Sequence, residues 1–342
     1  MVVQILNNPE GARCDRVGDH YTSRFLKRHP SIATIVARSV DRDRALALNE
    51  ECLEAYFDDL QDCIRRNEIL PDDMWNFDEK GFMMGRGGKK NELVISRVRV
   101  KTPRRVQQGN RKWVTLIECV SVTGKRLPAF YVYAGAAHYA DWHQNRDIGP
   151  QTVFAYTDNG GKKDYVGLEW LRTHFGKHAL PSKPGRIRLL LCDNHSSHDT
   201  FEFYEYCLEN NAALFFHPLH ATHVLQSLDV GVFTPLDQYC AQEVDDWTAT
   251  QPLHASLLKG GFLPMCERAR KKGIIPQNIR SAWAECVIHP FNRVRVMSNP
   301  KWLFASFPST SRIATTTRWA RKKPPAFLPF PYRNGAPQDY YT

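Results

Sequence analysis

The chain has 342 residues, 42% hydrophobic and 24% charged, which suits one large globular domain with appendages or two smaller domains. No apolar run approaches the roughly 18 residues of a transmembrane helix, and the N-terminus lacks a basic-then-apolar signal, so we expect a soluble intracellular protein with no membrane partner. The net charge of +10 favours a polyanionic partner such as nucleic acid, although many basic proteins bind none.

The first half of the chain predicts one long helix and then strands. Apolar residues recur at three- and four-residue steps from Asp41 to about Arg66, as in an amphipathic helix. MWNFDEKGFMMG, residues 74–85, predicts a strand that carries Asp78 and then a turn. KWVTLIECVSVTGKRLPAFYVYAG, residues 112–135, predicts two strands joined by a turn around Gly124.

The second half alternates between helix and strand. VGLEWLRTHF (166–175) predicts a helix, RIRLLLCD (186–193) a buried strand, FEFYEYCLENN (201–211) a short helix and AALFF (212–216) another strand. LDVGVFTPLDQYCAQEVDDW (228–247) predicts the start of a helix, despite its glycine and proline. Strands followed by this alternation predict a mixed α/β sheet covered by helices.

Three aspartates occupy positions typical of a catalytic site in such a sheet. Asp78 lies in the first strand, Asp193 ends the fourth, and Asp229 begins the helix after the next strand. Carboxylates that meet at strand ends repel each other, and Mg²⁺ or Mn²⁺ relieves this repulsion. Two such ions can clamp a phosphoryl displacement. Alternatively, Asp78 and Asp229 are ordinary turn or N-cap residues, because 36 acidic residues offer many such triples.

The motifs around these aspartates resemble those of the pogo/Tigger-like DDE transposases, especially the fungal members. The resemblance extends from about Val17 to Met297 and includes several motifs in the family's order. They are NFDEKGFMMG (76–85), QQGNRKWVTLIECVSVTGKRLPAF (107–130), DNGGKKDYVGLEWLRTHF (158–175), DNHSSH (193–198), YCLENNAALFFHPLHATHVLQSLDVGVFTPL (206–236) and IRSAWAECVIHPFNRVRVM (279–297).

The resemblance implies an RNase H-like fold with a metal-dependent site for DNA strand cleavage and strand transfer, acting in the nucleus. Asp78, Asp193 and Asp229 fall on the family's three catalytic positions, and there they would bind two Mg²⁺ or Mn²⁺ ions. No other small-molecule cofactor is expected. His195 and His198 would orient Asp193 or contact phosphate, or they merely pack in a turn.

Two further groups of residues could bind a ligand or could have only a structural role. Residues 97–112 hold seven basic side chains, which would contact the DNA backbone or form a solvated surface: Arg97, Arg99, Lys101, Arg104, Arg105, Arg111 and Lys112. His217, His220 and His223 follow a zinc-like spacing, but Pro218 disfavours a regular helix, and the family has a turn-forming loop here. The sequence has no Walker A motif and no GxSxG motif, so it does not support an NTPase or a serine hydrolase.

The expected organisation has four parts. Residues 1–70 would be a helical remnant of a helix-turn-helix DNA-binding region with a linker helix, and residues 71–250 the catalytic domain. Residues 251–300 would be its helical extension, and residues 301–342 a basic, proline-rich, poorly ordered tail. In YTSRFLKRHP (21–30), basic residues would attract phosphates without reading sequence: Arg24, Lys27 and Arg28.

Two departures from the family pattern favour an alternative function. Ser227 stands where the family has proline, and Asp237 stands where it usually has lysine. Replacing a cation by a carboxylate beside DNA weakens phosphate attraction. The alternative is a catalytically silent DNA-binding or assembly protein, descended from a transposase. Whether the chain forms a homodimer is left open.

Overall fold

The computed structural model describes residues 20–29, 50–84, 112–135, 145–157, 163–193, 200–218, 221–252 and 255–298. The chain divides into two units, Met1–Arg42 and Asp43–Thr342. In the first unit, α2 (Tyr21–Arg28) forms over the segment expected to be helical. Lys27 and Arg28 lie in its last turn, where cations complement the negative end of the helix dipole.

The second unit is built on one mixed sheet of six strands, in the order β4-β3-β2-β1-β5-β6. The strands β1, β2 and β3 form an antiparallel meander, while β5 and β6 run parallel to β1, and β4 runs parallel to β3. This arrangement confirms the predicted RNase H-like mixed sheet. The strands are β1 (Met74–Met83), β2 (Trp113–Ser121), β3 (Phe130–Ala134), β4 (Val153–Thr157), β5 (Arg188–Cys192) and β6 (Ala212–Phe216).

The turn between β2 and β3 requires glycine at position 124. Gly124 has φ +93°, a conformation that residues with a Cβ atom rarely adopt. Its N–H donates to the carbonyl oxygen of Ser121 at 3.0 Å. A Cβ atom there would also lie 3.0 Å from the carbonyl oxygen of Pro276. The turn therefore forms where the sequence predicts it, and glycine allows the C-terminal helices to approach it closely.

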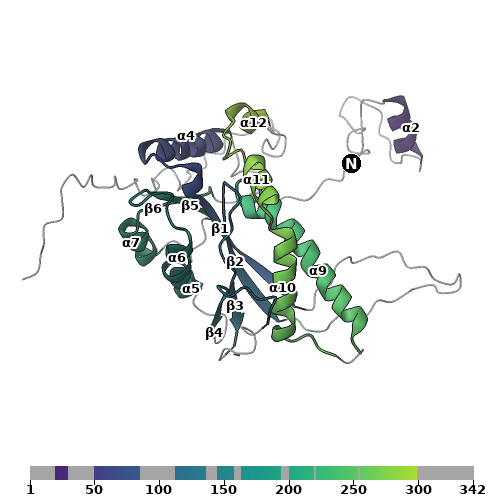
Figure 1. Cartoon of the computed structure of the whole chain (residues 1–342). Coiled ribbons are helices and arrows are strands. Elements are labelled where there is room, and N and C mark those ends of the chain that lie inside the picture. Colours follow the sequence, from purple (N-terminus) through teal and green to yellow (C-terminus); the bar gives the residue numbers. More distant parts are fainter. Residues whose placement is uncertain are drawn as a thin grey trace, which may run out of the picture. The chain divides into compact units, whose positions relative to one another are not determined.

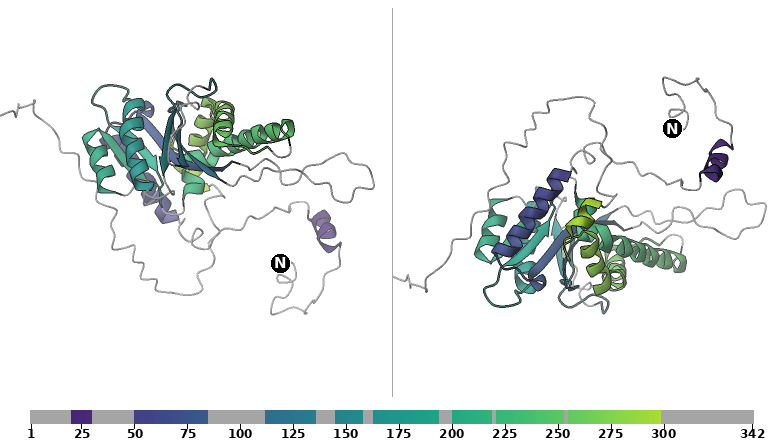
Figure 2. Two further views of the ribbon diagram at one scale, coloured as in Figure 1. Left: turned by 90° about the horizontal axis from the view of Figure 1, so that it is seen from below. Right: turned by 90° about the horizontal axis from the view of Figure 1, so that it is seen from above.

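One face of the sheet is covered by the helices that follow β4 and β5 (Figures 1 and 2). Phe77 on β1 stacks on Trp170, with ring centroids 4.5 Å apart, and Phe203 packs into the same buried cluster. The covering elements are α5 (Lys163–Trp170), the π-helical turn η3 (Leu171–Phe175), α6 (Gly176–His178) and α7 (Phe201–Glu209).

The opposite face carries the larger buried cluster, in which side chains from helices before and after the sheet pack on the strands. The elements on this side are α4 (Glu50–Arg66), α8 (Thr222–Leu225), the π-helical turn η5 (Leu228–Val232), α9 (Phe233–Thr250), α10 (Lys259–Gly273) and α11 (Pro276–Glu285). Figure 1 shows the long helices α9 and α10 on this side of the sheet. The short helices η1 (Pro71–Asp73) and α12 (Arg293–Ser298) complete this part of the chain.

The alternation of side chains along β1 decides which face carries the site. Trp75 and Phe77 point into the cluster beneath α5 and α7, whereas Met74 and Phe82 point into the cluster beneath α9 and α10. Successive side chains of a strand point to opposite faces. Asp78 therefore shares the face of Met74 and Phe82, which is the face that η5 and α9 cover.

The structure differs from the sequence prediction in two places, the unpredicted strand β4 and the turn after Ser227. β4 was not predicted, so the strand before Asp193 is the fifth rather than the fourth. The described part of the first long helix begins at Glu50, and residues 41–49 lie outside the described residues. The segment after Ser227 opens with a π-helical turn before regular helix begins.

The tail expected over residues 301–342 lies outside the described residues. Among the helices that are described, none is both long and apolar enough to cross a membrane.

Candidate active site

Asp78 and Asp193 come together through the parallel pairing of β1 and β5. In that ladder Met74 faces Leu189, and Asn76 faces Leu191, an offset of 115 positions. Continuing the same register by two residues brings Asp78 opposite Asp193, which directly follows the last residue of β5. Both side chains are half-buried. The separation of 115 positions along the chain thus equals the register offset of the parallel pair β1 and β5.

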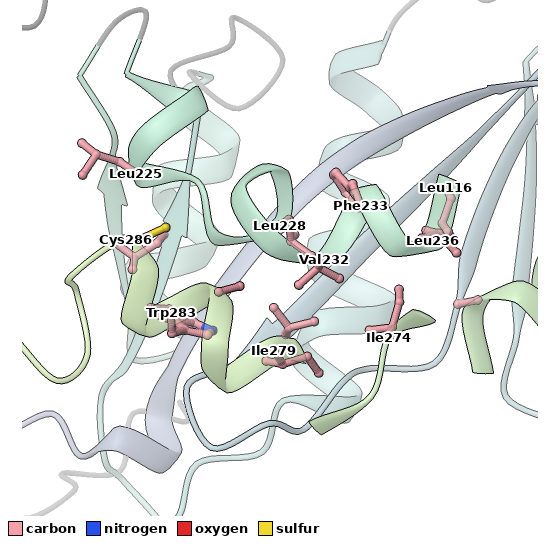
Figure 3. Packing of buried hydrophobic residues seen from close by; sticks show 14 of the residues in the cluster. Leu116, Leu225, Leu228, Val232, Phe233, Leu236, Ile274, Ile279, Trp283 and Cys286 are labelled. Carbon is pink, nitrogen blue, oxygen red and sulfur yellow. The ribbon is translucent and has the colours of Figure 1, made fainter. Parts of the chain in front are cut away.

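Asp229 reaches the same region from η5, the π-helical turn that opens α9. The N–H of Phe233 donates to the carbonyl oxygen of Leu228, five residues back, so the backbone is wider here than in an α-helix. Such π-turns often occur at functional sites. Leu228 and Val232 are fully buried, and Figure 3 shows them beside Trp283 and Ile279 of α11. The packing of Leu228 and Val232 fixes η5 against α11, while Asp229 in the same turn is exposed.

Close packing between η5 and α11 explains the glycine within LDVGV. A Cβ atom on Gly231 would lie 2.8 Å from the Cβ atom of Ala282 and 3.1 Å from its Cα atom. Contacts below 3.0 Å require one of the two elements to shift, because well-packed interiors leave no spare volume. Gly231 therefore lets the turn that carries Asp229 lie directly on α11.

The three carboxyl groups affect one another electrostatically. Burial raises the pKa of Asp78 well above its ordinary value, and the charges of Asp229 and Asp193 raise it further. A hydrogen bond from the backbone N–H of Glu79, 2.8 Å long, acts in the opposite direction. The pKa of Asp229 is also raised, although its residue surface is exposed, because partial burial of the carboxyl group and the charge of Asp193 outweigh the nearby Lys80. Asp78, Asp193 and Asp229, from distant segments, thus lie near enough to affect one another's charge, and the region that they occupy is called the acidic site below.

Two basic side chains, Lys80 and His223, lie near Asp229. Lys80 follows Asp78 by two residues on the same face of β1, and its charge lowers the pKa of Asp229. His223, on α8, acts on Asp229 in the same direction but more weakly. The Nζ atom of Lys80 also lies 2.8 Å from Oδ2 of Asp237 on α9. Asp237 is the residue that departs from the family's lysine, and here it forms an ion pair with Lys80.

A fourth carboxylate beside Asp78 is already neutralised. Glu118 stands directly opposite Asp78 in the β1–β2 ladder, so the two side chains share a face of the sheet. Glu118 is fully buried and accepts two hydrogen bonds from the guanidinium of Arg270, a short one from Nε and one of 3.0 Å from Nη2. Burial raises the pKa of Glu118, and Arg270 acts against that rise. Glu118 therefore belongs to a buried ion pair and not to the acidic site.

The acidic site suits a divalent cation in its chemistry. Carboxylate oxygens are the ligands that Mg²⁺ and Mn²⁺ prefer, and a cation would relieve the repulsion that raises the pKa of Asp78. Within the residues that the structure describes, however, no three His, Cys, Asp or Glu side chains are close enough together to form a finished metal site. Asp78, Asp193 and Asp229 are therefore brought to one region without the spacing of a completed centre.

Several predicted residues lie outside this description. His195 and His198 fall in residues 194–199, and the basic side chains from Arg97 to Arg111 fall in residues 85–111, neither of which the structure describes. Lys112 is described and exposed, immediately before β2. Burial lowers the pKa of Lys259, and the charge of Lys112 lowers it further. Two basic side chains therefore lie near each other at the start of β2.

His217 does not fit the alternative of a zinc site in HPLHATH. His217 is buried, with Nδ1 2.9 Å from the hydroxyl of Tyr56 and Nε2 3.2 Å from Oε1 of Gln226. Both ring nitrogens therefore have partners within the protein. His220 lies outside the described residues, and His223 lies near Asp229, as described above.

Sequence reasoning missed the polar residues beneath the aspartates. Asn76, Gln226 and Ser227 are fully buried, and Asn76 forms a hydrogen bond with each of the other two. The available signal was a run of polar side chains inside otherwise apolar segments, since buried polar groups require partners. Lys80 was also missed, although it stands in the same DEKG motif as Asp78.

Comparison with known proteins identifies the family. The model of the DDE superfamily endonucleases matches residues 110–283, about half of the chain. Two curated fungal proteins are similar to the chain. The MFS-type transporter clz9 of Cochliobolus lunatus is 34% identical over 230 residues, covering 67% of this chain and 24% of that protein. The Chaetoglobosin A biosynthesis cluster protein C of Chaetomium globosum is 36% identical over 69 residues, covering 20% and 17%. The chain thus spans about a quarter or less of these relatives.

Solved structures of the Mos1 transposase are also similar to the chain. The mariner Mos1 paired end complex with Mg has 15% identity and a TM-score of 0.43, covering 84% of this chain and 74% of that one. The catalytic domain of Mos1 mariner transposase has 13% identity and a TM-score of 0.33, covering 75% and 98%. The family match over half of the length is the evidence that decides: the chain belongs to the DDE superfamily endonucleases.

Proposed function

We propose that the chain is a metal-dependent DNA endonuclease of the transposase type, with Asp78, Asp193 and Asp229 as its catalytic carboxylates. The observation that carries the proposal is the β1–β5 register, which brings Asp78 opposite Asp193 when it is continued by two residues. Asp229 lies near enough for its charge to raise the pKa of Asp78. The three residues come from segments that are 115 and 36 positions apart. A group of like charges in one region is costly unless a cation balances it.

The three carboxylates would hold two Mg²⁺ or Mn²⁺ ions and fix their positions relative to the scissile phosphate. When bound, these ions supply charge neutralisation for the attacking and leaving oxygens of an in-line displacement. In cleavage, a bond forms between a water oxygen and phosphorus, while the bond from phosphorus to the 3′ oxygen breaks and leaves a 3′-hydroxyl. In strand transfer, the oxygen of that hydroxyl forms a bond to phosphorus in a second DNA segment. The bond from this phosphorus to its own 3′ oxygen breaks, and the proton of the attacking hydroxyl is released while the departing 3′ oxygen gains one. Lys80 would add positive charge beside Asp229, facing the phosphate.

DNA is the proposed partner because the chain carries a net charge of +10 and a run of basic residues just before β2. Contacts of this kind bind the phosphate backbone and do not read sequence. Lys112 and Lys259 would extend the basic surface at the start of β2. A DNA substrate makes the nucleus the proposed compartment, and a second copy of the chain is a proposed partner in joining two DNA ends.

Nicking of supercoiled plasmid in the presence of Mn²⁺ tests the proposal. Wild type should nick the plasmid, and Asp193→Asn should abolish nicking without loss of fold. Asp59→Asn is the matched control, because Asp59 is an exposed aspartate of α4 outside the site. Equal nicking by wild type and Asp193→Asn would refute the catalytic assignment.

A second function, a catalytically silent DNA-binding or assembly protein, is supported by one observation. Asp237 pairs with Lys80 and so reduces the positive charge available to a phosphate beside the site. The same experiment separates the two functions, because a silent protein would bind the plasmid without Mn²⁺-dependent nicking by the wild type.

A further inference from the structure

The amide side chain of Asn76 lies at the centre of a buried hydrogen-bond network beneath the three aspartates. It is 1% exposed and joins three separate segments. Its Nδ2 donates to the carbonyl oxygen of Leu191 at 3.1 Å and, through a short hydrogen bond, to Oε1 of Gln226. Its Oδ1 accepts from the hydroxyl of Ser227 at 2.7 Å and from the N–H of Leu228 at 3.3 Å. Both hydrogens of the amide, and both lone pairs of its oxygen, are therefore used.

The positions that this amide connects have a common relation to the site. Asn76 precedes Asp78 by two residues, Leu191 precedes Asp193 by two, and Ser227 precedes Asp229 by two. In a strand, a step of two residues returns to the same face. The side chain of Asn76 therefore links the three segments that carry the aspartates. In each segment, the linked residue lies two positions before the aspartate.

The network continues into the protein and leaves one pattern of donors and acceptors. Nε2 of Gln226 donates to the carbonyl oxygen of Phe77 at 3.1 Å, so its Oε1 must be the acceptor for the other partners. His217 then donates from Nε2 to Gln226, and its Nδ1 accepts from the hydroxyl of Tyr56. Burial lowers the pKa of His217 to about 4, which suits a neutral ring. Because each group has a single consistent role, the network favours one arrangement of β1, β5 and η5.

From this geometry we infer that Asn76, together with Ser227, is a positioning residue for the acidic site. It sets the separation of Asp78, Asp193 and Asp229 before any metal binds, and it touches neither metal nor DNA. The inference rests on the proposed function, because it assigns Asn76 a role in holding those carboxylates for a divalent cation. Residues that orient metal ligands commonly affect metal affinity or activity by about 10–100-fold when they are changed.

Ser227 offers the sharper test, because Asn76→Ala removes four hydrogen bonds at once and can prevent folding. Ser227→Ala removes only the hydroxyl that donates to Asn76, and it leaves a side chain of nearly the same volume. Ser121→Ala is the matched control. Ser121, the last residue of β2, is also a fully buried serine, and its hydroxyl bonds to Thr123 and Lys125 in the turn after β2.

The experiment measures Mn²⁺ affinity by calorimetry, thermal stability without metal, and the rate of plasmid nicking. Asp78→Asn identifies which part of the Mn²⁺ binding belongs to the acidic site. Both serine variants should lose comparable thermal stability. Only Ser227→Ala should weaken Mn²⁺ binding at that site, by about tenfold, and lower kcat with little change in the KM for DNA.

The outcomes separate the two proposals. Wild type that binds Mn²⁺ through Asp78 but does not nick DNA overturns the proposed function, and the positioning role is still decided by the Mn²⁺ affinities. Equal Mn²⁺ affinity of Ser227→Ala and Ser121→Ala overturns the positioning role, even if the wild type nicks DNA. Wild type that binds no Mn²⁺ overturns both.

Discussion

Lys80 and Asp237 form an ion pair that joins β1 to α9, with 2.8 Å between Nζ and Oδ2. The ammonium group also lies over the ring of Phe233, 5.3 Å from its centroid. Lys80 lowers the pKa of Asp229, whereas Asp237 raises it. The pair therefore controls how much positive charge stands beside the acidic site, and it gives the departure at position 237 a physical consequence.

Asp237→Asn should strengthen binding to DNA of any sequence. The change releases Lys80 from its partner and removes a carboxylate that repels phosphate. An exposed ion pair contributes up to about 1 kcal/mol, so affinity should rise by up to about fivefold. The salt dependence of binding should steepen by about one unit or less. Fluorescence anisotropy with a labelled duplex in EDTA measures both.

Asp246→Asn is the control for this prediction, because Asp246 is exposed on the same helix and the change in net charge is the same. It should alter DNA affinity much less than Asp237→Asn. Equal effects of the two variants would mean that net charge, and not the pair with Lys80, explains the result.

Gly231→Ala should destabilise the fold by about 1–3 kcal/mol, because the added Cβ atom meets Ala282 at 2.8 Å. Urea denaturation measures the loss. Adding Ala282→Gly should restore part of it, since the second change removes the atom that the first one meets.

Gly261→Ala is the comparison for this prediction. Its added Cβ atom would meet only the flexible end of the Leu257 side chain, at 3.2 Å. Alanine is favoured over glycine within a helix, so this variant should be neutral or more stable by up to about 1 kcal/mol. A Gly231→Ala protein as stable as Gly261→Ala would show that α11 does not fix the position of η5.

Arg270→Met should destabilise the protein by about 3–5 kcal/mol, because Glu118 would be left as a buried charge without its partner. The double variant Glu118→Leu/Arg270→Met should recover much of this loss, as apolar replacements of a buried pair are often tolerated. Thermal or urea unfolding of the single and double variants makes the comparison. A double variant less stable than Arg270→Met would contradict this reading of the pair.

The stability of metal-free protein should depend on pH through Asp78. Its pKa in the folded state is raised above the ordinary value of 3.8, so the folded state retains the proton longer than the unfolded state does. Stability is then present below about pH 4 and is lost as the pH rises through the folded-state pKa. Asp78→Asn lacks this loss, so its advantage in Tm over wild type should grow with pH.

For a chain of this size, each kcal/mol corresponds to about 2–4 °C in Tm. Adding Mn²⁺ should stabilise wild type at pH 7 and leave Asp78→Asn unchanged. An advantage of Asp78→Asn that stays constant from pH 4 to pH 8 would show that Asp78 does not titrate in this way.

Much of the fold could be predicted from local patterns. The strand AALFF appears as β6 over the same five residues, because an apolar run between two asparagines and a proline leaves little alternative. The turn at Gly124 follows from glycine between two β-rich segments. β4 was missed because VFAYT is short and its burial does not follow a simple alternation, so its place at the sheet edge depends on pairing with β3.

The candidate site was predictable only in part. Asp78, Asp193 and Asp229 stand out because they follow or interrupt apolar segments, and the motifs around them resemble a known family. The roles of Asn76 and Ser227 could not be predicted, since their bonds link residues 151 positions apart. Neither could the pairing of Asp237 with Lys80, because a salt bridge between a strand and a distant helix depends on how the two elements pack.

Asp78, Asp193 and Asp229 are proposed to act as one unit, and the rate of Mn²⁺-dependent plasmid nicking by their asparagine variants tests this most directly. Residues that act together show non-additive losses, so each single variant should lose as much activity as the triple variant. The prediction is nicking by wild type and by Asp59→Asn, and none above background by any of the three single variants or the triple. A single variant that nicks at the wild-type rate, or a triple variant that still nicks, would contradict the account.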